Sequence, residues 1–146
     1  MARVAEELHA TVAGRLRRAG QRYTSARRAL IDVLAAARRP LTVADIAETD
    51  RLVPLSTTYR NLAVLTQVGV LHRFSGADCA RFELAEDLTE HHHHLVCLNC
   101  GEVEDFTLPP SAERAVSKAL EDLAISSGYL LEGHRLDALG RCARCR

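Results

Sequence analysis

The sequence predicts an α+β protein with two domains. A winged helix-turn-helix domain is expected over residues 1–85, and a small α/β dimerisation domain with one helix on a three-stranded sheet over residues 86–146. Three observations predict this class. Apolar residues recur at helical spacing up to Gly69 and in short β-type runs after it. Residues 1–85 include 13 basic and 8 acidic residues (+5), and residues 86–146 include 6 basic and 11 acidic residues (−5). Both Cys-x-x-Cys pairs lie in the second part.

Length and composition narrow the class of protein. The 146 residues are too few for a large multidomain enzyme, and 47% hydrophobic with 26% charged residues is typical of a folded globular chain. There is neither a long apolar run nor a signal-peptide pattern, so we expect a cytoplasmic protein without a membrane partner. The positive part favours contact with a polyanion, and the negative part favours a role with cations.

Four helices are expected in the first domain. The first is basic and covers residues 5–19. The second begins at Thr24 or Ser25, which are both favourable N-caps. The third begins at Thr42, and Asp45 follows three residues later, at the position of the acid in a capping box.

The fourth helix has the clearest pattern, because its apolar residues keep helical spacing throughout. Ser56 is expected to cap it and Gly69 to end it. Two strands follow at residues 70–74 and 80–84, joined by a turn at 75–78. Helices followed by such a hairpin form a winged helix-turn-helix, whose last helix can enter the major groove of DNA.

The second domain begins with a polar hinge at residues 86–90. Strands are expected over residues 91–98, 102–106 and 129–139, and an amphipathic helix, capped by its first residue, over residues 111–126. A helix and three strands in about 60 residues make a marginal core. The domain is therefore expected to need a metal, a partner subunit, or both.

Four of the five cysteines form two pairs with two residues between the thiols. The pairs are Cys97 with Cys100 and Cys142 with Cys145. Two such turns brought together supply four thiolates to one tetrahedral ion, so the pairs predict a structural zinc site. The alternatives are disulfide bonds and a thioredoxin-like redox motif.

Four consecutive histidines precede the first cysteine pair, at His91, His92, His93 and His94. Alternate side chains of a strand point to opposite faces, so one run can supply two metal sites. The alternatives are a cloning tag and an exposed strand without a ligand role.

These motifs together resemble the ferric uptake regulator family of bacterial metal-dependent repressors. The matching segments occur in the family's order at residues 20–27, 56–62, 81–84, 91–101 and 142–145. The resemblance implies a homodimer that binds an inverted-repeat operator in double-stranded DNA and represses metal-homeostasis genes when metal is bound. It also implies that the protein is not an enzyme and takes no small organic substrate.

The residues expected to contact DNA lie at the start of the fourth helix and around the start of the second. They are Thr57, Thr58, Tyr59 and Arg60, together with Arg22 and Arg27. Arg60 could bind guanine or phosphate, and the arginines as a group favour phosphate. Tyr59 could instead pack in the core, because it lies in the apolar stripe of its helix.

The resemblance also implies a sensory metal site formed by Glu83, His92, His94 and Asp105. Carboxylates with imidazoles suit iron or manganese as well as zinc. The expected cofactors are therefore one structural Zn²⁺ and a regulatory Zn²⁺, Fe²⁺ or Mn²⁺.

The sequence departs from many iron- and peroxide-sensing members of the family, which have a further histidine just before the third helix. This chain has Arg-Arg-Pro-Leu there, at residues 38–41. The zinc-sensing branch uses a ligand at the end of the first wing strand, where this chain has His72, and a cysteine in the following segment. Cys79 is a candidate for that cysteine, although it could be a bystander thiol, and His72 could simply face solvent.

A second site on the opposite strand face would use His91, His93 and His134, as in the family. The family also uses a glutamate of the helix, but the helix is longer here and the aligned position is near Ser117. Glu113, which lies on the same helix, is therefore only a candidate for the fourth ligand.

Two other classes of function could use the same ligands. A small zinc-dependent hydrolase is disfavoured, because no HExxH or similar motif is present and the basic half would have no role. A metal-storage or delivery protein would bind metal tightly with no metal-linked change in DNA affinity.

Overall fold

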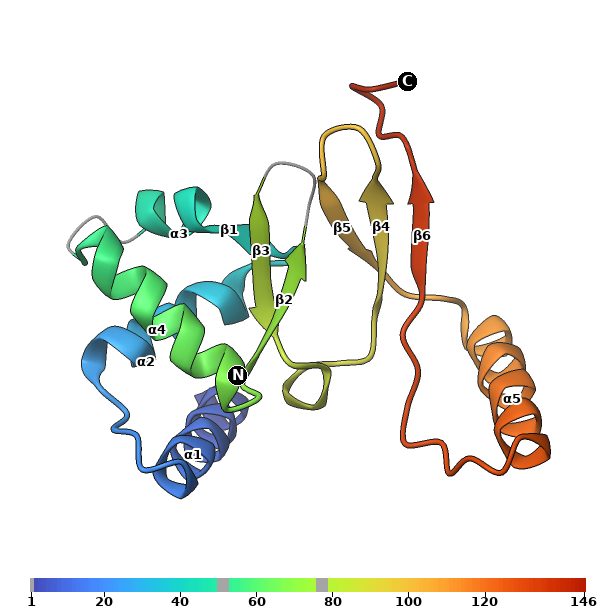
Figure 1. The fold of residues 1–146 in the computed structure, drawn as a ribbon, viewed down its shortest axis with the longest axis horizontal. Helices are drawn as coiled ribbons and strands as arrows, with labels where there is room; N and C mark the ends of the chain where they lie inside the picture. Colours follow the sequence, from blue (N-terminus) through green and yellow to red (C-terminus); the bar gives the residue numbers. More distant parts are fainter. Residues whose placement is uncertain (1, 50–52, 76–78) are drawn as a thin grey trace. The chain divides into compact units, whose positions relative to one another are not determined.

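The computed structural model describes residues 2–49, 53–75 and 79–146, and divides the chain into two compact units, Met1–Glu90 and His91–Arg146 (Figure 1). The boundary follows residue 90 rather than residue 85, because the short 3₁₀ helix η1 (Glu86–Leu88) belongs to the first unit. Leu88 packs against the apolar core of that unit, and Asp87 forms an ion pair with Arg15. The polar segment is therefore held by the first unit over most of its length.

The described part of the first unit is a winged helix-turn-helix with four α-helices and a three-stranded antiparallel sheet in the order β1-β3-β2. Its elements are α1 (Ala2–Arg18), α2 (Ser25–Ala36), β1 (Leu41–Thr42), α3 (Val43–Thr49), α4 (Leu55–Gln67), β2 (Leu71–Ser75) and β3 (Ala80–Leu84). The β2–β3 hairpin confirms the predicted wing, although residues 76–78 of its expected turn lie outside the described residues. The sequence pattern did not predict β1, which pairs with β3 so that Leu41 lies opposite Phe82.

Two of the helices begin where local side-chain chemistry predicts. Thr24 caps α2, because its side chain accepts a hydrogen bond from the backbone N–H of Arg27 at 3.3 Å. Thr42 and Asp45 form the predicted capping box before and within α3. The backbone N–H of Thr42 donates to the Asp45 carboxylate at 2.8 Å, and that of Asp45 donates to the Thr42 hydroxyl at 3.1 Å.

The prediction for the start of α4 is wrong. The helix begins at Leu55 after Pro54, and Ser56 lies inside its first turn. Proline can precede a helix because its φ is already fixed near the helical value and it has no N–H to satisfy. The predicted stop is confirmed, since Gly69 has a φ of +73° just after the helix ends.

One apolar core joins the helices and the sheet of the first unit. Its buried residues are Val12, Leu16, Leu30, Ile31, Leu34, Leu41, Val43, Ile46, Leu62, Leu65, Val70, Leu71, Phe82 and Leu84. Leu62 and Leu65 anchor α4 in this core. The opposite face of α4 is therefore left on the surface.

The second unit contains β4 (His93–Cys97), β5 (Val103–Phe106), α5 (Pro110–Ser126) and β6 (Asp137–Gly140). β4 pairs antiparallel with β5 and parallel with β6, which confirms a helix with a three-stranded sheet in the order β5-β4-β6. The first strand is shorter than predicted, and the third occupies residues 137–140 rather than 129–139, because only its last part pairs with β4. The helix begins at Pro110 rather than at Ser111, since proline fits the first helical turn.

The helix α5 is largely exposed. Ala124 is its one buried residue, whereas Leu123 and Ile125 are 61% and 76% exposed. The segment after the helix continues this apolar surface with Tyr129 and Leu130. The second unit therefore has a small core of its own, as its length predicts.

Across the described residues, no helix is both long and apolar enough to cross a membrane.

Candidate metal centres and nucleic-acid interface

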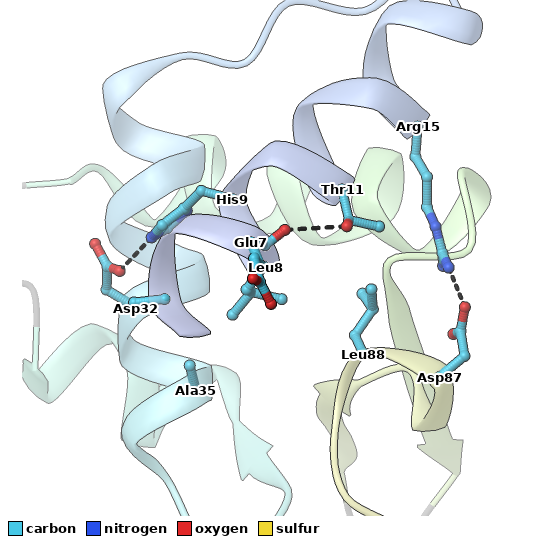
Figure 2. A pocket seen from close by; sticks show the side chains of 10 residues that line it. Glu7, Leu8, His9, Thr11, Arg15, Asp32, Ala35, Asp87 and Leu88 are labelled. Atoms are coloured by element: carbon cyan, nitrogen blue, oxygen red, sulfur yellow. Dashed lines mark hydrogen bonds and ion pairs between the residues drawn. The ribbon is translucent and has the colours of Figure 1, made fainter. Parts of the chain in front are cut away.

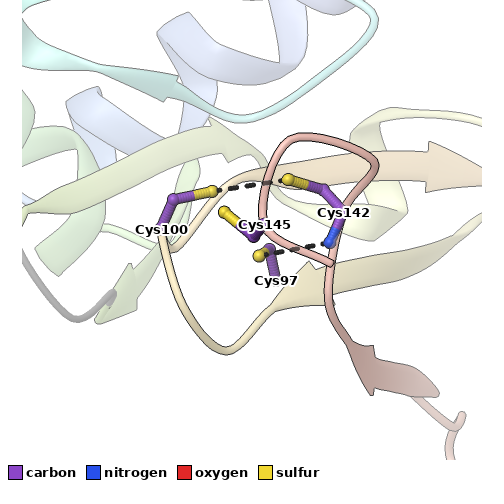
Figure 3. Close-up of side chains that lie close together, drawn as sticks. All are labelled: Cys97, Cys100, Cys142 and Cys145. Atoms are coloured by element: carbon purple, nitrogen blue, oxygen red, sulfur yellow. Dashed lines mark hydrogen bonds between the residues drawn. The ribbon is translucent and has the colours of Figure 1, made fainter.

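The four predicted cysteines come together at one end of the second sheet (Figure 3). The parallel pairing of β4 with β6 places Cys97 opposite Gly140, so the two Cys-x-x-Cys turns follow neighbouring strand ends. All four Sγ atoms lie within 4.8 Å of one another, and those of Cys100 and Cys142 are 3.7 Å apart. This compact tetrathiol group has the composition and spacing of a closed structural zinc site.

Backbone donors prepare the cysteine cluster for a cation. The N–H groups of Cys142 and Cys100 point at the sulfur of Cys97 and lower the pKa of that thiol to about 6. The backbone N–H of Arg144 acts in the same direction on Cys142, but burial and the neighbouring thiols outweigh it and raise the pKa of Cys142 to about 11. One thiol therefore ionises readily while a second resists ionisation next to it. A divalent cation would compensate the added negative charge, so zinc fits the group.

A second ligand group surrounds Glu113 of α5. Its carboxylate lies 2.8 Å from Nε2 of His93, 3.2 Å from Nε2 of His91 and 3.0 Å from Nε2 of His134. The structure thus brings together all four residues considered for the second site. Hydrogen bonding to His93 is the main effect that lowers the pKa of Glu113, which keeps the carboxylate ionised.

Two polar atoms of this group fit a bound metal. Oε1 of Glu113 and Nε2 of His134 are buried and close together, yet neither makes a hydrogen bond of good geometry. Buried polar atoms normally have partners, so this arrangement suits donors that converge on a cation. His93 of this group is fully buried.

The third group lies on the other face of the histidine strand. Ligand atoms of His92, His94 and Asp105 lie within 4.8 Å of one another, and Nε2 of His94 is 3.9 Å from Asp105. The register of β4 with β5 accounts for this, because His94 lies directly opposite Asp105. Alternate histidines therefore serve two different groups, as the strand geometry predicts.

Asp137 is a residue of this third group that sequence reasoning missed. It lies opposite His94 in the parallel β4–β6 pair, and its carboxylate is 3.1 Å from Nδ1 of His94. A carboxylate on one ring nitrogen orients a histidine so that the other nitrogen can bind metal. No sequence spacing could have identified Asp137, because 43 residues separate it from His94.

The remaining candidate sensory residues lie in the first unit. His72 on β2 and Glu83 on β3 are directly opposite each other, so both side chains project from the same face of the wing. The ring of His72 also packs edge-on against Phe74, with centroids 4.5 Å apart. Cys79 is exposed just before β3 begins.

The predicted DNA-binding residues fall into two classes. Arg22, Tyr59 and Arg60 are exposed, and Thr57 is partly exposed. Tyr59 is 56% exposed, so the alternative that it packs in the core is wrong. Thr58 is 5% exposed and faces the core side of α4, which leaves it unsuited to direct DNA contact.

The prediction that Arg27 contacts DNA is also not supported by its position. Arg27 is 9% exposed, and its guanidinium group is used inside the protein. Nε donates to the side-chain oxygen of Asn61 at 3.1 Å, Nη1 to the backbone oxygen of Arg22 at 2.6 Å, and Nη2 to the side-chain oxygen of Gln21 at 3.3 Å. Asn61 is another residue that sequence reasoning missed, since it lies 34 positions from Arg27.

A separate groove of about 590 Å³ lies between α1, α2 and η1 (Figure 2). At its edge, burial raises the pKa of Tyr23 to about 12, so its hydroxyl stays protonated and donates to Nδ1 of His9. Nε2 of His9 then donates to Asp32 at 2.8 Å. These bonds hold α1 against α2, and Arg15 ties α1 to Asp87 of η1.

Comparison with known proteins agrees with this arrangement. The model of the ferric uptake regulator family matches residues 18–138. A 128-residue stretch is 33% identical to the ferric uptake regulation protein of Brucella abortus and covers 84% of this chain and 85% of that protein. A 96-residue stretch is 36% identical to the ferric uptake regulation protein of Bordetella parapertussis, and covers 64% of this chain and 63% of that relative.

A solved structure shows the same fold. The ferric uptake regulator from Pseudomonas aeruginosa with manganese superposes with a TM-score of 0.67 at 28% identity, and the match covers 88% of this chain and 95% of that one. The family model spans most of the chain, from α1 to β6. The chain therefore belongs to the ferric uptake regulator family.

Proposed function

We propose that the protein is a metal-dependent transcriptional repressor that binds an inverted-repeat operator as a homodimer. The observation that carries this proposal is the combination of two features in one chain. A winged helix-turn-helix presents Arg22, Tyr59 and Arg60 on its surface, and the second unit holds three groups of metal ligands. The proposed role assigns the protein to the cytoplasm, where it controls metal-homeostasis genes.

The three ligand groups suit different roles. The four cysteines would hold a structural Zn²⁺, because four thiolates leave no open coordination position. The groups with histidines and carboxylates would hold a regulatory Zn²⁺, Fe²⁺ or Mn²⁺, since these donors suit all three ions. The group around Glu113 would be the second, supporting site.

In the proposed mechanism, the sensory metal takes ligands from both units. We assign the sensory role to His92, His94 and Asp105, completed either by Glu83 or by His72 with Cys79. Metal binding then stabilises the arrangement of the two units in which these ligands come together. The population of molecules shifts toward that arrangement only if it binds metal more tightly than the other arrangements do. Zinc would favour the set with the thiolate, and iron or manganese would favour the set with Glu83.

Dimerisation is supported by the apolar surface of α5 and of the segment that follows it. Leu123, Ile125 and Leu130 are 61%, 76% and 89% exposed on a unit that has little core of its own. A second copy of this unit would cover such a surface and stabilise both copies. Two winged domains in a symmetric dimer would match two half-sites of an inverted repeat.

The test combines metal analysis with DNA selection. The protein, purified under reducing conditions, is expected to contain about one tightly bound zinc per chain. Fragments of its own genome are then selected with zinc, manganese or ferrous iron added separately after mild chelation. Retention of specific fragments with one metal supports the proposal and identifies the metal. Tight metal binding with no retention under any metal would refute the repressor and favour metal storage.

Two variants sharpen this test. His92→Ala should keep the structural zinc and the fold yet lose metal-dependent DNA binding. Tyr59→Ala should bind metal normally and lose DNA affinity, because Tyr59 is exposed on α4 and belongs to none of the three ligand groups. A normal metal response in His92→Ala would remove His92 from the sensory site.

A further inference from the structure

Arg27 is a buried cation that uses its guanidinium group inside the protein. It is about nine-tenths buried, and every nitrogen of its guanidinium group that forms a described hydrogen bond does so within the protein. The three acceptors are a backbone oxygen and two side-chain amide oxygens, all of them neutral. An arginine used to bind phosphate would instead keep its planar group free at the surface.

The three bonds connect the segments that carry the exposed DNA-binding candidates. Arg27 itself lies in the first turn of α2. Its Nε bonds Asn61, which directly follows Arg60 on α4 and is 8% exposed. Its Nη1 bonds the backbone oxygen of Arg22 at 2.6 Å, and Nη2 bonds Gln21 in the same loop.

We propose that Arg27 is a positioning residue for DNA binding: it holds the loop of Arg22 and the recognition helix α4 in a fixed relation, and it does not contact DNA. This inference rests on the proposed function, since it concerns how the same surface binds DNA. The rigid fork of arginine matters, because its three nitrogens each reach a different acceptor. A lysine at this position would keep the charge, but its donors all lie on one nitrogen, whereas the three acceptors are bonded by three different nitrogens of Arg27.

The first experiment measures the affinity for a DNA fragment retained in the selection experiment, by fluorescence anisotropy over a range of salt concentrations, with the metal that caused the retention. Arg22→Met should reduce the slope of log affinity against log salt by about 0.9, the value for one lost phosphate contact. Arg27→Lys and Arg27→Met should both weaken binding by about tenfold or more, since each breaks charged hydrogen bonds. The matched control for the loss of one positive charge is Arg28→Met, because Arg28 is exposed on the same helix, α2.

Direct contact predicts the opposite pattern. If Arg27 bound phosphate, the charge-conserving Arg27→Lys would bind DNA within about twofold of wild type, and Arg27→Met alone would lower the salt slope. That result would overturn the proposal. Wild-type protein that binds no DNA under any metal would refute the proposed function itself, and the role of Arg27 with it.

A double-mutant cycle tests the connection to α4. Asn61→Ala removes one acceptor and leaves every exposed residue of α4 in place, so it should weaken DNA binding without changing the salt slope. In the double variant with Arg27→Lys, the two losses should not multiply, because both changes break the same contact. Fully multiplicative losses, or an Asn61→Ala variant with wild-type affinity, would overturn the proposal.

Folding is checked in the same samples by circular dichroism melting and zinc content. If Arg27→Lys is unfolded at the assay temperature, Asn61→Ala decides the question alone. In the free protein, the Arg27 Nε–H resonance should be protected from solvent exchange and should lose that protection in Asn61→Ala. Rapid exchange of this proton in the wild type would contradict the buried network.

Discussion

Replacing Cys142 with serine should unfold the second unit and leave the first intact. Cys142 follows β6, and its backbone N–H and sulfur contact the sulfurs of Cys97 and Cys100. Serine is nearly the same size, but it does not supply the thiolate that a tetrahedral zinc site needs. The change therefore removes the link between the end of the chain and β4.

The size of the effect follows from the length of chain that the site closes. Cys100 and Cys142 are 42 residues apart, and a cross-link over such a loop stabilises a fold by about 4 kcal/mol in the chain-entropy description. Small domains have a total stability of about 5–15 kcal/mol. The second unit buries few apolar side chains, chiefly Val103 and Ala124, so it should lie at the low end. A loss of about 4 kcal/mol is then enough to unfold much of it.

Hydrogen–deuterium exchange with mass spectrometry resolves the two units in one experiment. Peptides from β4 and β6 should lose protection in Cys142→Ser and in wild-type protein treated with a strong chelator. Peptides from α2 and α4, which contribute to the core of the first unit, should keep theirs. Cys79→Ser is the matched control, because Cys79 is exposed and outside the cluster.

The reasoning would be refuted by a Cys142→Ser protein that retains one zinc per chain and normal protection of β6. Loss of protection in both units together would also contradict it, since the first unit has its own core.

Three further predictions concern the metal centres and the core. Asp137→Ala should weaken metal binding at His94 by about ten- to hundredfold in chelator competition. Asp137→Asn should keep most of the wild-type affinity, because the amide oxygen can still accept the hydrogen bond from His94. Equal losses of affinity in the two variants would instead make Asp137 a direct ligand. Zinc binding to the cysteine cluster should release protons, seen by calorimetry in two buffers. Its affinity should fall more steeply below about pH 6, where Cys97, whose pKa is lowered to about 6, takes up a proton; a pH-independent affinity would contradict this. Ile31→Ala, at a fully buried position, should lower the stability of the first unit by about 2–5 kcal/mol in denaturant unfolding without changing zinc content.

The candidate site shows which features local sequence can predict. The cysteine pairs were predictable because each turn needs only two residues between its thiols, and the histidine run because a strand alternates its faces. Glu113 was a weaker candidate, since its helix position did not align with the family. Its distances to His91, His93 and His134 in the structure support its place in the second group.

The features that sequence reasoning missed depend on long-range pairing. Asp137 reaches His94 only through the parallel β4–β6 register, and β1 exists only because it pairs with β3. The start of α4 was misplaced by two residues, because a serine such as Ser56 is a common cap, whereas the helix is capped by Pro54, whose fixed φ suits the entry.

The sequence alone determined the winged helix-turn-helix, the second α/β unit and the residue types of the metal centres. These depend on periodicity and on short spacings, which act within a few residues of the chain. The tertiary structure decided the role of each arginine and the partners of each histidine. Arg22 and Arg27 look alike in the sequence, yet one is exposed and the other is buried against Asn61. Burial arises from packing between segments distant in the chain, so no local pattern records it.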